Sequence, residues 1–289
     1  MTSRTIKFQH PAYRDDIADL STVRPLPGPH VEQIDPFLFL NHHGPQVYQP
    51  NNAGLPFGPH PHRGFETVTF ILAGELSHLD SGGHENIIGA GGVQWMTAGS
   101  GLIHAELSPE SFKRSGGLLE ILQLWVNLPA RLKMTKPAYI GLQKDQIPEI
   151  PLDGGRVKVK LASGEFAGTT GPIASLTGIS LMTVAMQPKG AVTLPAPPGH
   201  NVFLYTVRGN TAIDGVPINP QHLIELNDDG DAVNITAFTD ALILYGHAAP
   251  LNEPVVAHGP FVMNSREEIS QAIRDYQSGA FGNVTPGTR

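Results

Sequence analysis

The chain has 289 residues, which is long for one compact domain and suits two domains, each with its own core. It contains 32 glycines and 26 prolines but only 16% charged residues, a composition that favours short strands joined by turns over a helical bundle. The net charge of −7 and the lack of a basic run argue against direct binding to nucleic acid.

The sequence has no cysteine, so it excludes disulfides, thiolate metal sites and cysteine nucleophiles. His, Asp and Glu remain as the side chains that could bind a metal. The N-terminus is polar, and eighteen consecutive apolar residues occur nowhere. We therefore expect a cytoplasmic protein that does not associate with membranes, and we expect it to be a monomer.

The first part of the chain predicts strands before the main motif. Residues 5–9 alternate weakly between apolar and polar side chains, and the apolar residues 37–40 predict a buried strand. His42 and His43 follow directly. Adjacent residues of a strand face opposite sides, so both cannot easily serve one site, and we interpret them as a solvated loop pair.

Residues 66–72 and 75–79 alternate on either side of Ala73-Gly74, which predicts a hairpin. Short apolar segments separated by glycine-rich turns then predict further strands and a barrel or sandwich. These segments are 87–88, 93–96, 102–107 and 118–128.

The second half repeats this style after a polar linker that we place at 141–155, so we expect two domains at 1–145 and 146–289. The turn at Arg208-Gly209-Asn210 resembles the turn at Ala73-Gly74-Glu75, which suggests an internal duplication. Strands are predicted at 157–161, 181–186, 200–207, 223–226, 235–238 and 241–245.

One helix is predicted near the end of the chain. Ser265 and Glu268 have the spacing of a capping box, and an apolar stripe follows from Ile269 to Tyr276 before Gly279. We expect this stripe to pack on a barrel.

The most informative stretch carries two short pairs, His60-Pro61-His62 and His104-Ala105-Glu106. In a strand, residues two apart project from the same face, so each pair can direct two ligand atoms to one point. Where the two strands meet, the four side chains could bind one metal ion. The second half of the chain contains no such pair.

Three imidazoles and one carboxylate suit a borderline divalent metal better than calcium or magnesium. The ligand types alone leave the choice open among iron, nickel, cobalt, manganese, copper and zinc. Four protein ligands around an octahedral ion would leave two positions for water, dioxygen or a substrate, whereas a structural tetrahedral zinc would leave none.

Three segments resemble the signature blocks of the pirin family within the cupin superfamily: PHPHRGFETVTFIL, VQWMTAGSGLIHAE and PVVAHGPFVMNSREEISQAIRDYQSGAFG. The resemblance runs from Ile34 to the final helix. It implies an all-β bicupin, two cupin-type barrels with a short C-terminal helix. It further implies one mononuclear metal, most often Fe²⁺, in the N-terminal barrel and a C-terminal barrel that lacks ligands.

Carried over residue by residue, the family's ligands fall on His60, His62, His104 and Glu106. In many cupins the glutamate shortly after the first pair is the ligand, and that position is Glu66 here. The pirin pattern instead takes its carboxylate from the second pair. We therefore assign Glu66 to hydrogen bonding, with Arg63 or around the ligands.

The resemblance implies a dioxygenase that cleaves flavonols such as quercetin with O₂ and releases carbon monoxide. In this reading Glu106 is the catalytic base for the substrate hydroxyl. Phe57, Trp95 and Met96 flank the motifs and are candidates to line the pocket for a planar aromatic substrate, although ordinary barrel core is the interpretation that we prefer for each.

His78 and its neighbour Asp80 are candidates to support the ligands or orient the substrate. His258 lies in a family-like segment, and we expect it to be structural or on the surface. The alternative reading is a metal-containing regulator of transcription or of an enzyme, which binds a partner protein and uses the metal as a redox sensor.

Overall fold

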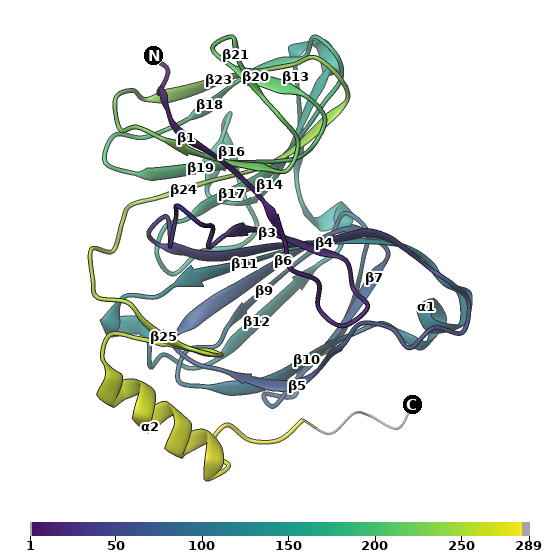
Figure 1. The fold of residues 1–289 in the computed structure, drawn as a ribbon, viewed down its shortest axis with the longest axis vertical. Coiled ribbons are helices and arrows are strands. Elements are labelled where there is room, and N and C mark those ends of the chain that lie inside the picture. The colour runs from purple at the N-terminus through teal and green to yellow at the C-terminus, as the bar shows by residue number, and fades with distance from the viewer. Residues whose placement is uncertain (1, 285–289) are drawn as a thin grey trace. The chain divides into compact units, whose positions relative to one another are not determined.

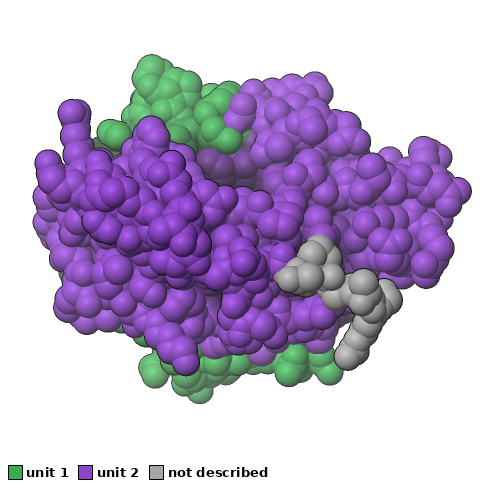
Figure 2. Space-filling model, turned by 90° about the horizontal axis from the view of Figure 1, so that it is seen from below, with its two compact units in different colours: residues 1–13, 24–38, 145–250 green, residues 14–23, 39–144, 251–289 purple. Residues whose placement is uncertain are grey.

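The computed structural model describes residues 2–284, which fall into two compact units. Figure 2 colours unit 1, residues 1–13, 24–38 and 145–250, and unit 2, residues 14–23, 39–144 and 251–289. The chain enters the long segment of unit 1 at Asp145, within the predicted linker. The predicted domains 1–145 and 146–289 are contiguous, whereas the two units interleave in sequence. The first segment of the chain joins unit 1, which is formed mostly by the second half, and the last segment joins unit 2, which is formed mostly by the first half.

Unit 2 is built on a seven-stranded and a four-stranded antiparallel sheet (Figure 1). The chain passes between the units at residues 13/14, 23/24 and 38/39, so three strands of the larger sheet are shared at their ends. The larger sheet has the order β12 (Ala138–Leu142), β9 (Val93–Thr97), β6 (Phe65–Ala73), β11 (Gly117–Asn127), β4 (Phe37–Tyr48), β3 (Thr22–Leu26), β2 (Tyr13–Arg14). The smaller sheet has the order β5 (Phe57–His62), β10 (Leu102–Leu107), β7 (Glu75–Asp80), β8 (Glu85–Gly89).

Unit 1 has the same two-sheet plan around its own apolar core. Its larger sheet has the order β1 (Ile6–Pro11), β22 (His222–Leu226), β19 (Asn201–Arg208), β24 (Ala241–Ala248), β17 (Ser180–Met186), β14 (Val157–Ser163), β13 (Glu149–Leu152). Its smaller sheet has the order β18 (Ala191–Pro195), β23 (Ala232–Ala237), β20 (Thr211–Ile213), β21 (Val216–Ile218), and β15 (Glu165–Phe166) pairs separately with β16 (Thr169–Thr170). The strands predicted for the second half are confirmed.

The two units correspond strand by strand. β5 and β10 of unit 2 occupy the positions of β18 and β23 in unit 1, and β1 takes the edge position that β12 takes in unit 2. The suggested internal duplication is therefore supported by the topology. It also explains why the first strand, expected in the N-terminal domain, belongs to unit 1.

The hairpin predicted around Gly74 is wrong. β6 pairs with β9 and β11, whereas β7 pairs with β8 and β10, so the chain leaves one sheet and enters the other at this glycine. Gly74 has φ +81, and Gly209 has φ +82 at the matching change of sheet between β19 and β20. Alternation on both sides of a turn is common to hairpins and to such corners, so the pattern could not separate them.

The interpretation of His42 and His43 as a solvated loop pair is also wrong. Both lie in β4 and are buried. His42 Nε2 lies 3.1 Å from the Glu120 carboxylate, and His43 Nδ1 lies 2.8 Å from the Thr22 hydroxyl. Polar partners on neighbouring segments, which the local sequence does not reveal, make their burial possible.

The predicted C-terminal helix is confirmed as α2 (Arg266–Gln277), and Ser265 and Glu268 form the capping box. Its residues Ile269 and Ala272 are buried in an apolar cluster with partly buried Ile103 of β10. The helix follows the hairpin of β25 (Val256–His258) and β26 (Phe261–Met263) (Figure 1).

The shorter helical elements are α1 (Glu110–Ser115) and the 3-10 segments Ala130–Leu132, Lys144–Gln146 and Asp153–Gly155. Within residues 2–284, every helix is too short or too polar to cross a membrane.

Unit 1 contains a buried imidazole whose ionisation opposes folding. His247 is 6% exposed, and its Nδ1 lies 3.1 Å from Nδ1 of His200. Burial, followed by the nearby charges of His200 and Arg4, lowers the pKa of His247 from 6.5 to about 4.

This shift predicts acid sensitivity. Between pH 6.5 and 4 the unfolded chain binds the proton that folded His247 excludes, so the free energy of unfolding falls as the pH drops through this window. Between pH 7.5 and 5 the free energy of unfolding should fall by about 2 kcal/mol less in His247→Asn than in the unmodified protein, measured by urea unfolding. His258→Asn, at an exposed position, is the matched control, and identical pH profiles for the two variants would contradict the prediction.

Candidate functional site

The antiparallel pairing of β5 and β10 brings the two histidine pairs together, as the spacing predicted. His60 lies directly opposite His104 in the register, and His62 lies opposite Leu102. Ligand nitrogens of His60, His62 and His104 all lie within 4.8 Å of one another. Three of the four predicted ligands therefore converge on one point in unit 2.

The hydrogen bonds of two histidines leave Nε2 available. His60 Nδ1 donates to the carbonyl of Gly58 at 2.7 Å, and His62 Nδ1 donates to the carbonyl of Pro260 at 3.3 Å. A carbonyl can only accept, so Nδ1 carries the proton and the Nε2 lone pair is free for a metal. In His104, both ring nitrogens are buried without a hydrogen-bond partner among the described residues.

Burial holds His62 and His104 in the neutral form that binds metals. Burial and the nearby charge of His60 lower the pKa of His62 from 6.5 to about 3, against the opposing hydrogen bond to Pro260. Burial, followed by the charges of His62, His60 and His78, lowers the pKa of His104 well below 6.5. Buried imidazoles with unused nitrogens are costly without a ligand, so this group fits a borderline divalent ion.

The fourth predicted ligand, Glu106, is buried in β10 and accepts hydrogen bonds at both carboxylate oxygens. Gln94 Nε2 and, at 3.2 Å, Thr69 Oγ1 donate to Oε1. Gln123 Nε2 donates to Oε2 at 2.5 Å. Its place in the ligand set stays a prediction, and its two glutamine partners were not predicted.

His78 lies beside the cluster. Its ring centroid is 5.5 Å from that of His104, and its Nε2 donates to Asp80 Oδ2 at 3.0 Å. His78 Nδ1 is buried without a partner in the part of the chain that the structure describes. Although burial acts the other way, hydrogen bonds from His78 and His84 lower the pKa of Asp80. His78 and Asp80 therefore lie near the cluster, and their supporting role stays a prediction.

Tyr139 of β12 connects His78 to the carboxylate side of the site. Its ring stacks on His78 with centroids 4.0 Å apart, and its hydroxyl donates to Gln94 Oε1 at 3.3 Å. Burial, followed by the Glu106 and Asp80 carboxylates, raises the pKa of Tyr139, so the hydroxyl keeps the proton that it donates.

Glu66 is hydrogen-bonded, as predicted, but to Thr97 rather than to Arg63. In β6, Thr69 contacts Glu106. Glu66 lies three residues before Thr69, so its side chain points to the opposite face of the strand. It accepts a hydrogen bond from Thr97 at 2.6 Å, while Arg63 pairs with Asp275. Burial raises the pKa of Glu66.

The same alternation turns Trp95 away from the site, because its neighbour Gln94 contacts Glu106. Met96 is on the same face as Gln94 and is fully buried. Phe57 pairs opposite Glu106 in the register and packs against the apolar cluster of unit 2.

Trp125 of β11, like Tyr139, is an aromatic residue beside the site that was not predicted from the sequence. Its ring centroid is 5.3 Å from that of His62 and 4.7 Å from that of Phe39, on which it stacks. It lies two residues after Gln123, so the alternation of β11 would have marked it once Gln123 was known to face the site.

The C-terminal segment completes the site within unit 2. The Pro260 carbonyl that fixes His62 lies between β25 and β26, next to the exposed His258, which confirms a surface position for that histidine. Gly64, with φ +88, lets this segment approach closely, because a Cβ there would lie 2.0 Å from the Val262 carbonyl oxygen.

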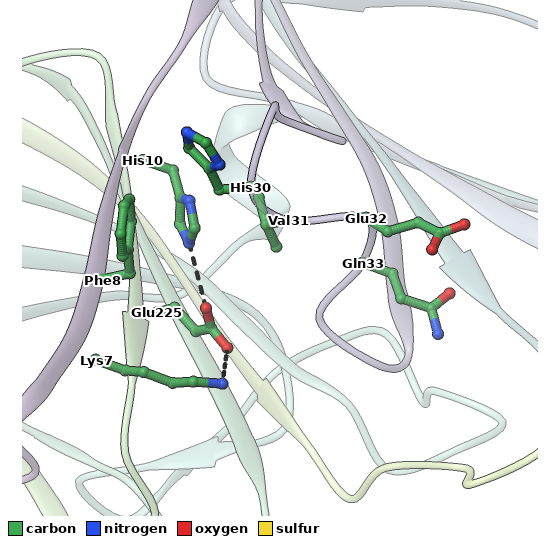
Figure 3. Close-up of a pocket in the computed structure, with 8 residues that line it drawn as sticks. All are labelled: Lys7, Phe8, His10, His30, Val31, Glu32, Gln33 and Glu225. Carbon is green, nitrogen blue, oxygen red and sulfur yellow. Dashed lines mark hydrogen bonds and ion pairs between the residues drawn. The ribbon is translucent and has the colours of Figure 1, made fainter.

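A separate cavity of about 730 Å³ lies in unit 1 (Figure 3). Phe8 stacks on His10, and the Glu225 carboxylate accepts hydrogen bonds from Lys7 and His10, as the dashed lines show. None of the residues that line this cavity belongs to the predicted site.

The chain matches known proteins along most of its length. Residues 19–126 match the family model described as Pirin, and residues 181–282 match the Pirin C-terminal cupin domain. A pirin-like protein of Caulobacter vibrioides is 40% identical over 268 residues, 92% of this chain and 94% of that protein. Human pirin is 37% identical over 265 residues, 88% of this chain and 85% of that protein.

Among solved structures, quercetin 2,3-dioxygenase from Acinetobacter baumannii superposes with a TM-score of 0.93 at 32% identity. The match covers 98% of this chain and 100% of that protein. The expected all-β fold of two cupin domains is thereby confirmed.

The different positions of Glu66 and Glu106 yield a prediction about metal binding. Glu106→Ala should weaken metal binding about 10–100-fold, because Glu106 lies on β10 with His104. Glu66→Ala should leave metal binding within about twofold, because Glu66 lies on β6 and points away from Glu106. Elemental analysis of the purified variants, after equal exposure to Fe²⁺, measures the difference. Equal losses in both variants would show that Glu106 is not the carboxylate ligand.

Proposed function

Because the chain belongs to the pirin family, we propose that it is a metal-dependent dioxygenase that cleaves flavonols such as quercetin with O₂. The observation that carries the proposal is the convergence of His60, His62 and His104, with unused nitrogens, on one buried point. The similarity to an Acinetobacter baumannii quercetin 2,3-dioxygenase supports the substrate class.

We assign one divalent ion, Fe²⁺ first and nickel, cobalt, manganese, copper or zinc as alternatives, to the three imidazoles and Glu106. When bound, such an ion would supply Lewis-acid and redox chemistry. His62, His104 and Glu106 are buried, whereas His60 is only partly buried. A substrate would therefore approach from the side of His60.

Glu106 is the candidate base for the 3-hydroxyl of the flavonol. Its Oε1 is engaged by Gln94 and Thr69, so the proton would move to Oε2, which has only Gln123 as a partner. The reaction would insert both oxygen atoms of O₂ into the substrate and release one carbon as carbon monoxide. Burial of Glu106 and His104 would exclude water from these groups.

Turnover is the direct test. Protein loaded with Fe²⁺, Ni²⁺, Mn²⁺ or Co²⁺ should consume O₂ and release carbon monoxide in equal amounts when quercetin is added, and metal-free protein should not. An oxygen electrode and a carbon monoxide assay measure both. No turnover with any of these ions, together with a partner protein that binds one iron oxidation state, would favour the regulatory reading.

The two tryptophans provide a matched test of the substrate-binding face. Trp125→Leu should raise the KM for quercetin about 3–10-fold, because it removes the aromatic surface beside His62. Trp95→Leu should lower stability without this change in KM, because Trp95 faces away from Glu106. Steady-state kinetics well below the unfolding temperature compares them, and an equal KM in both variants would exclude Trp125 from the substrate site.

A further inference from the structure

The hydrogen bonds at Glu106 use most of the acceptor capacity of its carboxylate. A carboxylate has about four lone-pair positions, two on each oxygen. Gln94 and Thr69 occupy both positions on Oε1, and Gln123 occupies one on Oε2. One lone pair of Oε2 remains for any other partner.

The orientation of the Gln94 amide follows from its hydrogen bonds. The Glu106 carboxylate can only accept, so the Gln94 amide nitrogen faces it, and Gln94 Oε1 accepts from the Tyr139 hydroxyl at 3.3 Å. Tyr139 is in turn held by its stacking on His78, whose ring lies beside His104. Donors from three different strands, β6, β9 and β11, therefore converge on the carboxylate.

We propose that Gln94 and Gln123 are positioning residues that hold the Glu106 carboxylate so that it presents a single Oε2 lone pair to the ion or to the substrate proton. This inference rests on the proposed function, in which Glu106 serves as ligand and as base, one role at a time because both roles need the same Oε2 lone pair. It assigns to the two glutamines a role that their sequence context did not indicate. The restraint limits Glu106 to one bond at a time on that oxygen.

The restraint can be measured without any activity. Co²⁺ is a suitable probe because its visible absorption reports the number and geometry of its ligands. The test variants are Gln94→Met, Gln123→Met and the double variant, which keep the side-chain length but remove the donors. Gln143→Met is the matched control, because Gln143 is a glutamine of the same unit that donates to the Ile87 carbonyl.

The double variant should bind Co²⁺ about 10–100-fold more weakly and should show a changed absorption spectrum, since the carboxylate is no longer held in one orientation. The control should bind within about twofold of the unmodified protein. Where Gln94→Met fails to fold, Gln123→Met alone provides the test, because Gln123 is only partly buried. A Gln123→Met protein that folds and shows unchanged affinity and spectrum would overturn the proposal.

Glu106→Gln separates this proposal from the proposed function. Weaker Co²⁺ binding in Glu106→Gln, with unchanged affinity and spectrum in the glutamine double variant, would reject the positioning role and leave Glu106 as a ligand. Unchanged Co²⁺ binding in Glu106→Gln would reject the ligand role of Glu106, and the positioning proposal would fall with it.

Discussion

The antiparallel pairing of β5 with β10 is the constraint on which the site depends. Because His60 stands opposite His104 in this ladder, and His62 lies on the same face as His60, three imidazoles meet without any loop having to bring them together. A slip of one residue would turn the histidines of one strand to the other face. The register therefore decides whether the group exists at all.

Contacts from distant parts of unit 2 preserve this geometry. The C-terminal segment supplies the Pro260 carbonyl to His62. Lys133, fully buried, donates to the carbonyls of Gly64 and Val262 and so ties the turn after His62 to the same segment. Arg63 binds Asp275 of α2. Each contact satisfies a buried polar group, which would destabilise the fold by about 1–3 kcal/mol if left unpaired.

The two barrels show how one plan serves two purposes. At the strands that match β5 and β10, unit 1 has Val192 and Leu194 on β18 and Val233 and Ile235 on β23, all within its apolar core. The same ladder thus contributes core packing in one unit and imidazoles in the other. The described residues contain one group of three potential metal ligands, and it lies in unit 2.

The sequence by itself determined many of the strands, among them β9 and β10 and those of the second half, the helix of residues 266–277 and the three histidines, because period-two spacing and capping are local properties. Only the tertiary structure decided which sheet each strand joins, as at Gly74, where a corner and a hairpin have the same local pattern. It also placed Gln94, Gln123 and Trp125 beside the predicted residues, because contacts between strands distant in sequence depend on register.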